Sequence, residues 1–168
     1  MDGVAVLKEG FSRIPELVAG AVADLDADQL STLPSGTGNS VGWLVWHLTR
    51  VQDAQIAEVA GHEQLWVADG WADRFGMEPD PGNHGYGHSL DQVAAVRPES
   101  GAVLVDYLEA VQARTMEYLD TLGDDDLDRV VDENWDPPVT LGVRLVSVVD
   151  DDVQHAGQAA YVRGLLLG

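Results

Sequence analysis

Cysteine is absent from the 168 residues of the chain. Its absence excludes disulfide bonds, metal sites built from thiolates and catalysis by a cysteine nucleophile. Any metal ion would therefore be bound by histidine and carboxylate side chains, which suit zinc, nickel, iron or manganese. Thiol chemistry would need a thiol from a small molecule. Serine nucleophile elbows, phosphate-binding P-loops and glycine-rich dinucleotide fingerprints are also absent.

Basic residues are few, with nine Lys and Arg against 29 Asp and Glu, and the formal net charge is −20. So acidic a surface repels phosphate backbones and anionic lipids. We therefore expect neither nucleic acid nor a membrane as partner. The acidity says nothing further about the small-molecule substrate that we expect. The sequence also lacks a secretory signal pattern and any apolar run approaching about 18 residues. These features predict a cytoplasmic protein.

Hydrophobic residues make up 45% of the chain, which is enough for one folded domain over residues 1–168. Apolar residues recur at intervals of three and four in four long segments, so we expect an all-α fold. Pro15 predicts a kink in the first helix, or a late start to it. The four predicted helices span residues 4–25, 41–61, 99–122 and 141–166.

The segment 62–98 separates the second and third predicted helices. It is rich in glycine, aspartate and aromatic residues and has no clear period. Such a segment fits a helical bundle with one long crossover connection, and long loops in compact domains are often functional. A short helix is expected within it, near residues 90–96.

The last predicted helix contains the strongest candidate for a metal site, the spacing D-x-x-x-H formed by Asp151 and His155. Residues four apart lie one turn above each other on a helix, so both side chains could bind one ion. Asp152 is three residues from His155 and could also do so. It falls on the apolar face of the helix, where a carboxylate is costly unless it is paired or bound to metal. Adjacent aspartates point about 100° apart, so we expect only one of the two to be a ligand.

His47 lies in the apolar, tryptophan-rich second helix and could supply a third ligand from across the bundle. Three protein ligands would leave positions open for water or substrate, as in a reactive metal site. The alternative is a buried histidine satisfied by a hydrogen bond. Trp43 and Trp46 are candidates for the wall of a pocket, and Gln158 lies on the same side of its helix as Asp151.

Three further histidines have less specific surroundings. His62 follows the glycine that ends the second predicted helix, where it would interact with the helix dipole. His84 and His88 are four residues apart, but the glycines between them argue against a helix, so their spacing does not define a metal site. The loop that carries them is either a metal-binding segment or a lid that contacts substrate.

Two stretches of the sequence resemble the signature helices of the DinB-like superfamily. They are VGWLVWHL at residues 41–48, and TLGVRL at residues 140–145 followed by HAGQA at residues 155–159. The resemblance is greatest to the DUF664 branch, which is related to the metal-binding domain of mycothiol-dependent maleylpyruvate isomerase. It covers both signature helices and is compatible with the whole chain.

The resemblance implies an antiparallel four-helix bundle with a long crossover between helices two and three, and a homodimer. It also implies a divalent metal, with zinc or nickel favoured, bound by His47, Asp151 and His155. Asp151 departs from the family pattern, in which His or Glu is usual. Relatives use the metal to activate a low-molecular-weight thiol such as mycothiol or bacillithiol. Isomerase activity is not implied, because the additional domain of the isomerase is missing from this sequence.

Our leading hypothesis is therefore a metal-dependent thiol S-transferase that uses a mycothiol-type cosubstrate. One alternative is a non-catalytic bundle that binds a small molecule or a partner and has a degenerate metal site. Another is a metal-dependent hydrolase that acts through metal-bound water.

Overall fold

The computed structural model describes residues 1–168 and is mostly helical. None of the helices combines the length and the hydrophobicity that a membrane-spanning segment requires. In chain order the elements are α1 (Gly3–Ser12), α2 (Ile14–Val22), α3 (Ala27–Ser31), η1 (Pro34–Gly36), α4 (Val41–Ala60), α5 (Leu65–Ala68), α6 (Trp71–Arg74), α7 (Leu90–Ala95), α8 (Gly101–Asp120), η2 (Asp124–Asp128), β1 (Val130–Asp132), β2 (Val139–Thr140) and α9 (Leu141–Leu167).

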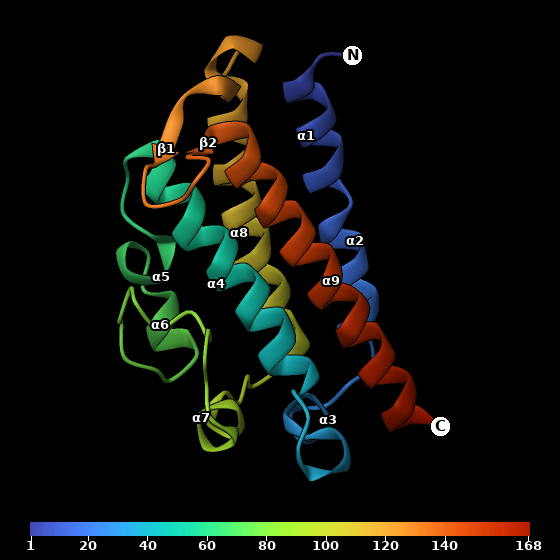
Figure 1. Ribbon diagram of the computed structural model, residues 1–168. Coiled ribbons are helices and arrows are strands. Elements are labelled where there is room, and N and C mark those ends of the chain that lie inside the picture. Colours follow the sequence, from blue (N-terminus) through green and yellow to red (C-terminus); the bar gives the residue numbers. More distant parts are fainter.

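The long helices lie side by side, with the hydrophobic core between them (Figure 1). α9 packs against α4 and α2, and α8 packs against the same two helices. Figure 1 shows α4 and α8 running toward the end that carries the small sheet, whereas α1, α2 and α9 run the opposite way. The segment between α4 and α8 brings the chain back along the outside of the bundle before α8 begins.

The first predicted helix is divided into α1 and α2, which meet at Arg13. Pro15 lies in the first turn of α2 and has no N–H to donate to the carbonyl of Phe11. That carbonyl accepts a hydrogen bond of 2.9 Å from the side-chain amide of Gln112 on α8. The predicted break at Pro15 is therefore confirmed, and a side chain from another helix compensates for the missing backbone bond.

The three other long helices end within two residues of their predicted bounds, because capping residues define their ends. The hydroxyls of Ser40, Ser100 and Thr140 each accept a hydrogen bond from the backbone N–H three residues later. Gly61 ends α4 in the left-handed conformation, with φ of 74°.

The segment after α4 contains more structure than the sequence predicted. α7 lies where a short helix was expected, but α5 and α6, of four residues each, were not foreseen. The expectation of a purely helical fold also needs a small correction, since β1 and β2 form a two-stranded antiparallel sheet. Elements this short contain too few residues to show a period, and contacts with the long helices determine them.

Candidate metal centre

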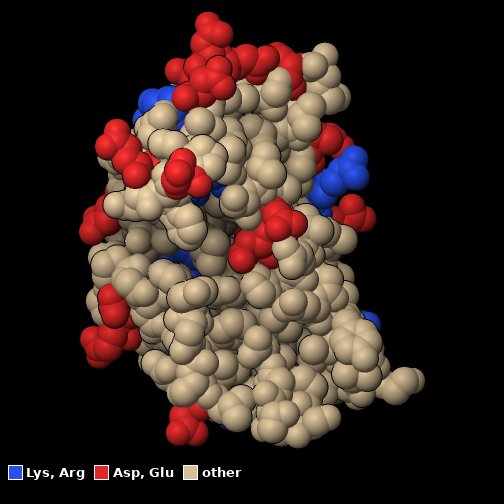
Figure 2. Space-filling model, viewed as in Figure 1, with Lys and Arg blue, Asp and Glu red and all other residues tan.

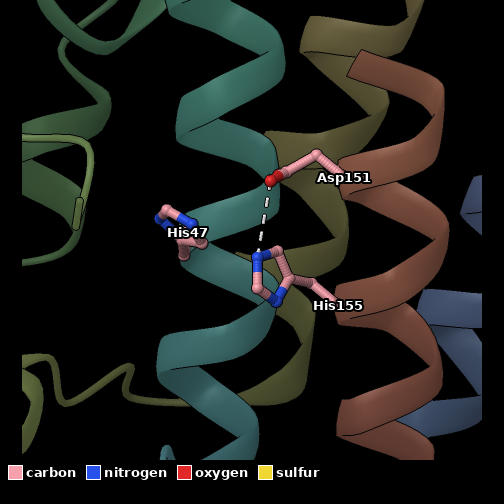
Figure 3. A group of neighbouring side chains, drawn as sticks. All are labelled: His47, Asp151 and His155. Carbon is pink, nitrogen blue, oxygen red and sulfur yellow. Dashed lines mark ion pairs between the residues drawn. The ribbon is translucent and has the colours of Figure 1, made fainter. Parts of the chain in front are cut away.

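His47, Asp151 and His155 come together where α4 packs against α9 (Figure 3). Asp151 and His155 project from successive turns of α9 toward α4, which contributes His47. One potential ligand atom from each residue lies within 4.8 Å of the others. His155 Nε2 is 3.5 Å from Asp151 Oδ1, and the two imidazole rings meet edge to face with centroids 4.7 Å apart.

Both histidines have their Nδ1 atoms occupied by oxygen acceptors. The Nδ1–H of His47 donates to the backbone carbonyl of His84, and that of His155 donates to Oε1 of Gln158 at 2.9 Å. Because these oxygens can only accept, the proton of each neutral ring lies on Nδ1 and the lone pair on Nε2. Metal-binding histidines are commonly oriented in this way by a partner on the other ring nitrogen.

The site brings together a carboxylate and an imidazole lone pair, and a cation between them would stabilise both. A hydrogen bond to Asp151 raises the pKa of His155, whereas burial lowers the pKa of His47. His47 is therefore favoured in its neutral form, whereas Asp151 favours the protonated form of His155. Oδ2 of Asp151 is buried and has no hydrogen-bond partner. A divalent cation could replace the proton and use these lone pairs.

The donor set fits such an ion. The 3.5 Å separation of His155 Nε2 from Asp151 Oδ1 is close to the roughly 3.4 Å between two ligands of a tetrahedral ion with bonds of about 2.1 Å. Two imidazoles and one carboxylate suit zinc or nickel, and three protein ligands leave coordination positions open. The arrangement can therefore bind a divalent ion and still admit a further ligand.

A cavity of about 280 Å³ adjoins His47 and Asp151. Figure 2 shows this face hollowed over α4, between the 62–98 segment and α9, with acidic side chains on the α9 side. The cavity gives a small molecule access to the ligand atoms. Its walls are formed by His47, Val51, Ala54, Gln55, His84, Tyr86 and Asp151.

The two tryptophans support the histidines from behind and do not line this cavity. Trp43 stacks on His47, with centroids 4.6 Å apart and planes inclined by 14°. Its indole N–H donates to Nδ1 of His88 at 3.2 Å, and His88 stacks on Trp46. Burial lowers the pKa of His88. Its neutral ring donates from Nε2 to Oδ1 of Asn83 at 2.9 Å, so it serves the loop and not the metal cluster.

Asp152 and His62 lie outside the cluster. Asp152 is fully buried on the core side of α9, and neither of its carboxylate oxygens has a partner. Burial, with a smaller effect of Asp151, raises its pKa well above the usual value, so the carboxyl stays protonated in the core. His62 Nδ1 instead contacts the carbonyl of Glu63. Of the two aspartates that the helical spacing left open, the structure brings Asp151 to the histidines.

A buried arginine holds the loop that orients His47, and sequence reasoning missed it. Arg50 is 0% exposed, and its guanidinium donates to the carbonyls of Asn83 at 3.1 Å and Pro81 at 3.2 Å. It also lies 3.5 Å from Asp53, which is itself buried. The available signal was two opposite charges three residues apart in a helix whose preceding turns are apolar.

The same loop lies directly against His47 at Gly85. The φ of Gly85 is +97°, and a Cβ there would be 2.6 Å from His47 Nδ1. It would also be 3.1 Å from atoms of Trp43 and Trp46. Only glycine allows the backbone to approach the ring this closely, which in turn lets the carbonyl of the preceding residue, His84, accept from His47.

Comparison with known proteins identifies a family and a similar solved structure. A family model described as DinB superfamily matches residues 11–159. A solved structure, described as the crystal structure of the conserved protein of locus from Enterococcus faecalis, is 35% identical, with a TM-score of 0.92. That alignment covers 100% of this chain and 99% of the other. No curated protein matches.

Proposed function

The chain belongs to the DinB superfamily, and from this membership together with the convergence of His47, Asp151 and His155 we propose that it is a divalent-metal-dependent enzyme. Its reaction would be the transfer of a low-molecular-weight thiol of the mycothiol type to an electrophile. The observation that carries the proposal is that one ligand atom of each of the three residues lies within 4.8 Å of the others, while Nδ1 of both imidazoles is engaged by an oxygen acceptor. We further infer that it belongs to the DUF664 branch and that the long helices form an antiparallel four-helix bundle.

The residues of the site would either bind the metal or orient the residues that bind it. His47, Asp151 and His155 would bind the metal, and Gln158 and the His84 carbonyl would keep the two rings in the binding orientation. A divalent ion at this position lowers the pKa of a bound thiol and favours its nucleophilic thiolate. The cavity beside the cluster would hold the electrophile, since it opens next to two of the proposed ligands.

The proposal is tested by assaying thiol conjugation with mycothiol and a series of electrophiles, using protein loaded with zinc or nickel and protein stripped by a chelator. Conjugation should require both the metal and the thiol. Metal-dependent turnover without any thiol would identify a hydrolase. Stoichiometric metal binding without thiol binding or turnover would identify a non-catalytic module.

Replacing Gly85 with alanine should weaken metal binding. The new methyl group would push against the His47 ring at the atom that donates to His84, and would turn Nε2 away from the other two ligands. Outer partners of metal-binding histidines typically contribute 10- to 100-fold to affinity, so we expect a loss of about that size. Competition with a chromophoric zinc chelator measures it.

Gly87→Ala is the matched control. Gly87 also has a positive φ, of +73°, but a Cβ there would meet nothing within 4 Å. Both substitutions introduce backbone strain of about 1 kcal/mol, and only the first touches His47. Equal metal affinities in the two variants would contradict the role given to the loop.

The partner that we propose is a second copy of the chain. Large apolar side chains are exposed along one side of α9, where a symmetric pair could bury them. Light scattering should give the mass of a dimer at micromolar concentration, and the mass of one chain would refute this. These side chains are Val143, Val146, Val153, Tyr161 and Leu165.

A further inference from the structure

A second cavity, of about 220 Å³, adjoins the first along the groove between α4 and α9. The two cavities share Val51, Gln55 and Asp151 in their walls. A molecule bound at the metal cluster could therefore extend along the groove past Asp151. The second cavity ends at Arg144, the only Lys or Arg side chain that lines either one.

Hydrogen bonds hold the Arg144 guanidinium in place, but a ligand could replace one of its partners. One of its terminal nitrogens donates to Oε1 of Gln55 and, at 2.8 Å, to Glu58. The other is 3.5 Å from Asp132, which is at the limit of a hydrogen bond. The Glu58 side chain is 64% exposed. Because an exposed ion pair contributes little to stability, an anionic ligand could take the place of Glu58.

Gln55 adds a second donor at the junction of the two cavities. Its Oε1 accepts from Arg144, so its NH₂ group points away from the guanidinium. No protein group accepts a hydrogen bond from that NH₂ in the structure, although Gln55 lines both cavities. The guanidinium and this amide together suit a carboxylate, which accepts several hydrogen bonds from donors of this kind.

We propose that the molecule that takes the open metal position carries a carboxylate, which Arg144 and Gln55 bind. Arg144 and Asp151 are seven residues apart on α9, so the carboxylate would lie about 10 Å from the metal-bound atom, or two helical turns. The inference rests on the proposed function and narrows its cosubstrate to an elongated thiol that carries an acidic group, which mycothiol itself does not have.

The test uses protein loaded with cobalt(II), because thiolate coordination to cobalt(II) produces an intense absorption band. Mercaptoacetate, mercaptohexanoate and mercapto-octanoate are titrated. Each is compared with the mercapto-alcohol of equal chain length, so that the contribution of the alkyl chain cancels. The acid should bind about tenfold more tightly than the alcohol at a length of roughly eight carbons, the gain expected of a charged hydrogen bond. Mercaptoacetate should show no preference, since it cannot reach Arg144.

Variants of residues in the groove show whether the preference for the acid depends on Arg144. Arg144→Met should remove the preference for the acid, and Glu58→Gln, which frees the guanidinium, should increase it. Arg74→Met is the matched control, because Arg74 is half-exposed and pairs with Asp106 away from the groove. Arg144→Lys keeps the charge, and should retain part of the preference if Arg144→Met proves too unstable to measure.

The outcomes separate the two proposals. If thiols produce the band but acids and alcohols bind equally at every length, or if Arg144→Met keeps the preference, the carboxylate site is refuted and the metal site stands. If cobalt does not bind, or no thiol produces the band, the proposed function fails and this inference fails with it.

Discussion

Replacing His155 with alanine should abolish metal binding. The imidazole supplies one of three protein donors, and the remaining two, His47 and Asp151, lie on different helices. Zinc sites with four protein ligands bind with about 10–16 kcal/mol, so one ligand contributes roughly 3–4 kcal/mol. The affinity should therefore fall about a thousandfold. Metal content after supplementation and dialysis, measured by mass spectrometry, checks the result.

His62→Ala is the matched control for this variant. It removes a histidine that lies outside the cluster, so it corrects for metal bound weakly by surface imidazoles. Asp151→Glu should bind metal at least as well as wild type, because His or Glu is usual at this position in the family that the sequence resembles. If wild type and the His155→Ala variant hold equal amounts of metal after supplementation, the proposed metal site is refuted.

The helical spacing predicted the pairing of Asp151 with His155 on α9, although it left Asp152 open as the alternative carboxylate. Residues four apart on one helix must share a side, and Asp151 and His155 do so. The approach of His47 depends on how α4 packs against α9, which no spacing within either helix determines. His47 could be proposed as a third ligand from across the bundle, and the family resemblance implied the same three residues, but neither determined the packing. The orienting carbonyl of His84 lies in a loop without a period, and could not have been predicted.

The long helices were predictable for a similar reason, since their caps and apolar periods are local signals. The segment after α4 could not be predicted in this way. Its course depends on Arg50 and Asp53, which bind backbone groups far away in the sequence. Asp152, the alternative carboxylate of the sequence analysis, is buried without a partner. Asp53, which the sequence analysis did not single out, has four hydrogen-bonding or ion-pair partners in the core.

Asp53→Ala should be among the most destabilising single changes in the protein. The side chain is only 3% exposed. It accepts hydrogen bonds from the backbone of Leu65 at 2.9 Å and Trp66 at 2.8 Å, and from the hydroxyl of Tyr107 at 2.7 Å. Its removal would leave the buried guanidinium of Arg50 without a counter-charge. Breaking a buried pair in this way typically costs about 3–5 kcal/mol, which urea denaturation would measure.

Asp106→Ala is the matched control for the loss of an aspartate. Asp106 pairs with Arg74 at 3.1 Å, but both side chains are about half-exposed, so the change should stay below about 1 kcal/mol. Asp53→Asn keeps the shape and removes the charge, and should fall between the two. Because Arg50 also holds the loop that orients His47, Asp53→Asn should lose metal affinity even where it remains folded. An Asp53→Ala variant as stable as Asp106→Ala would mean that water can replace the carboxylate, and that this cluster does not fix the loop.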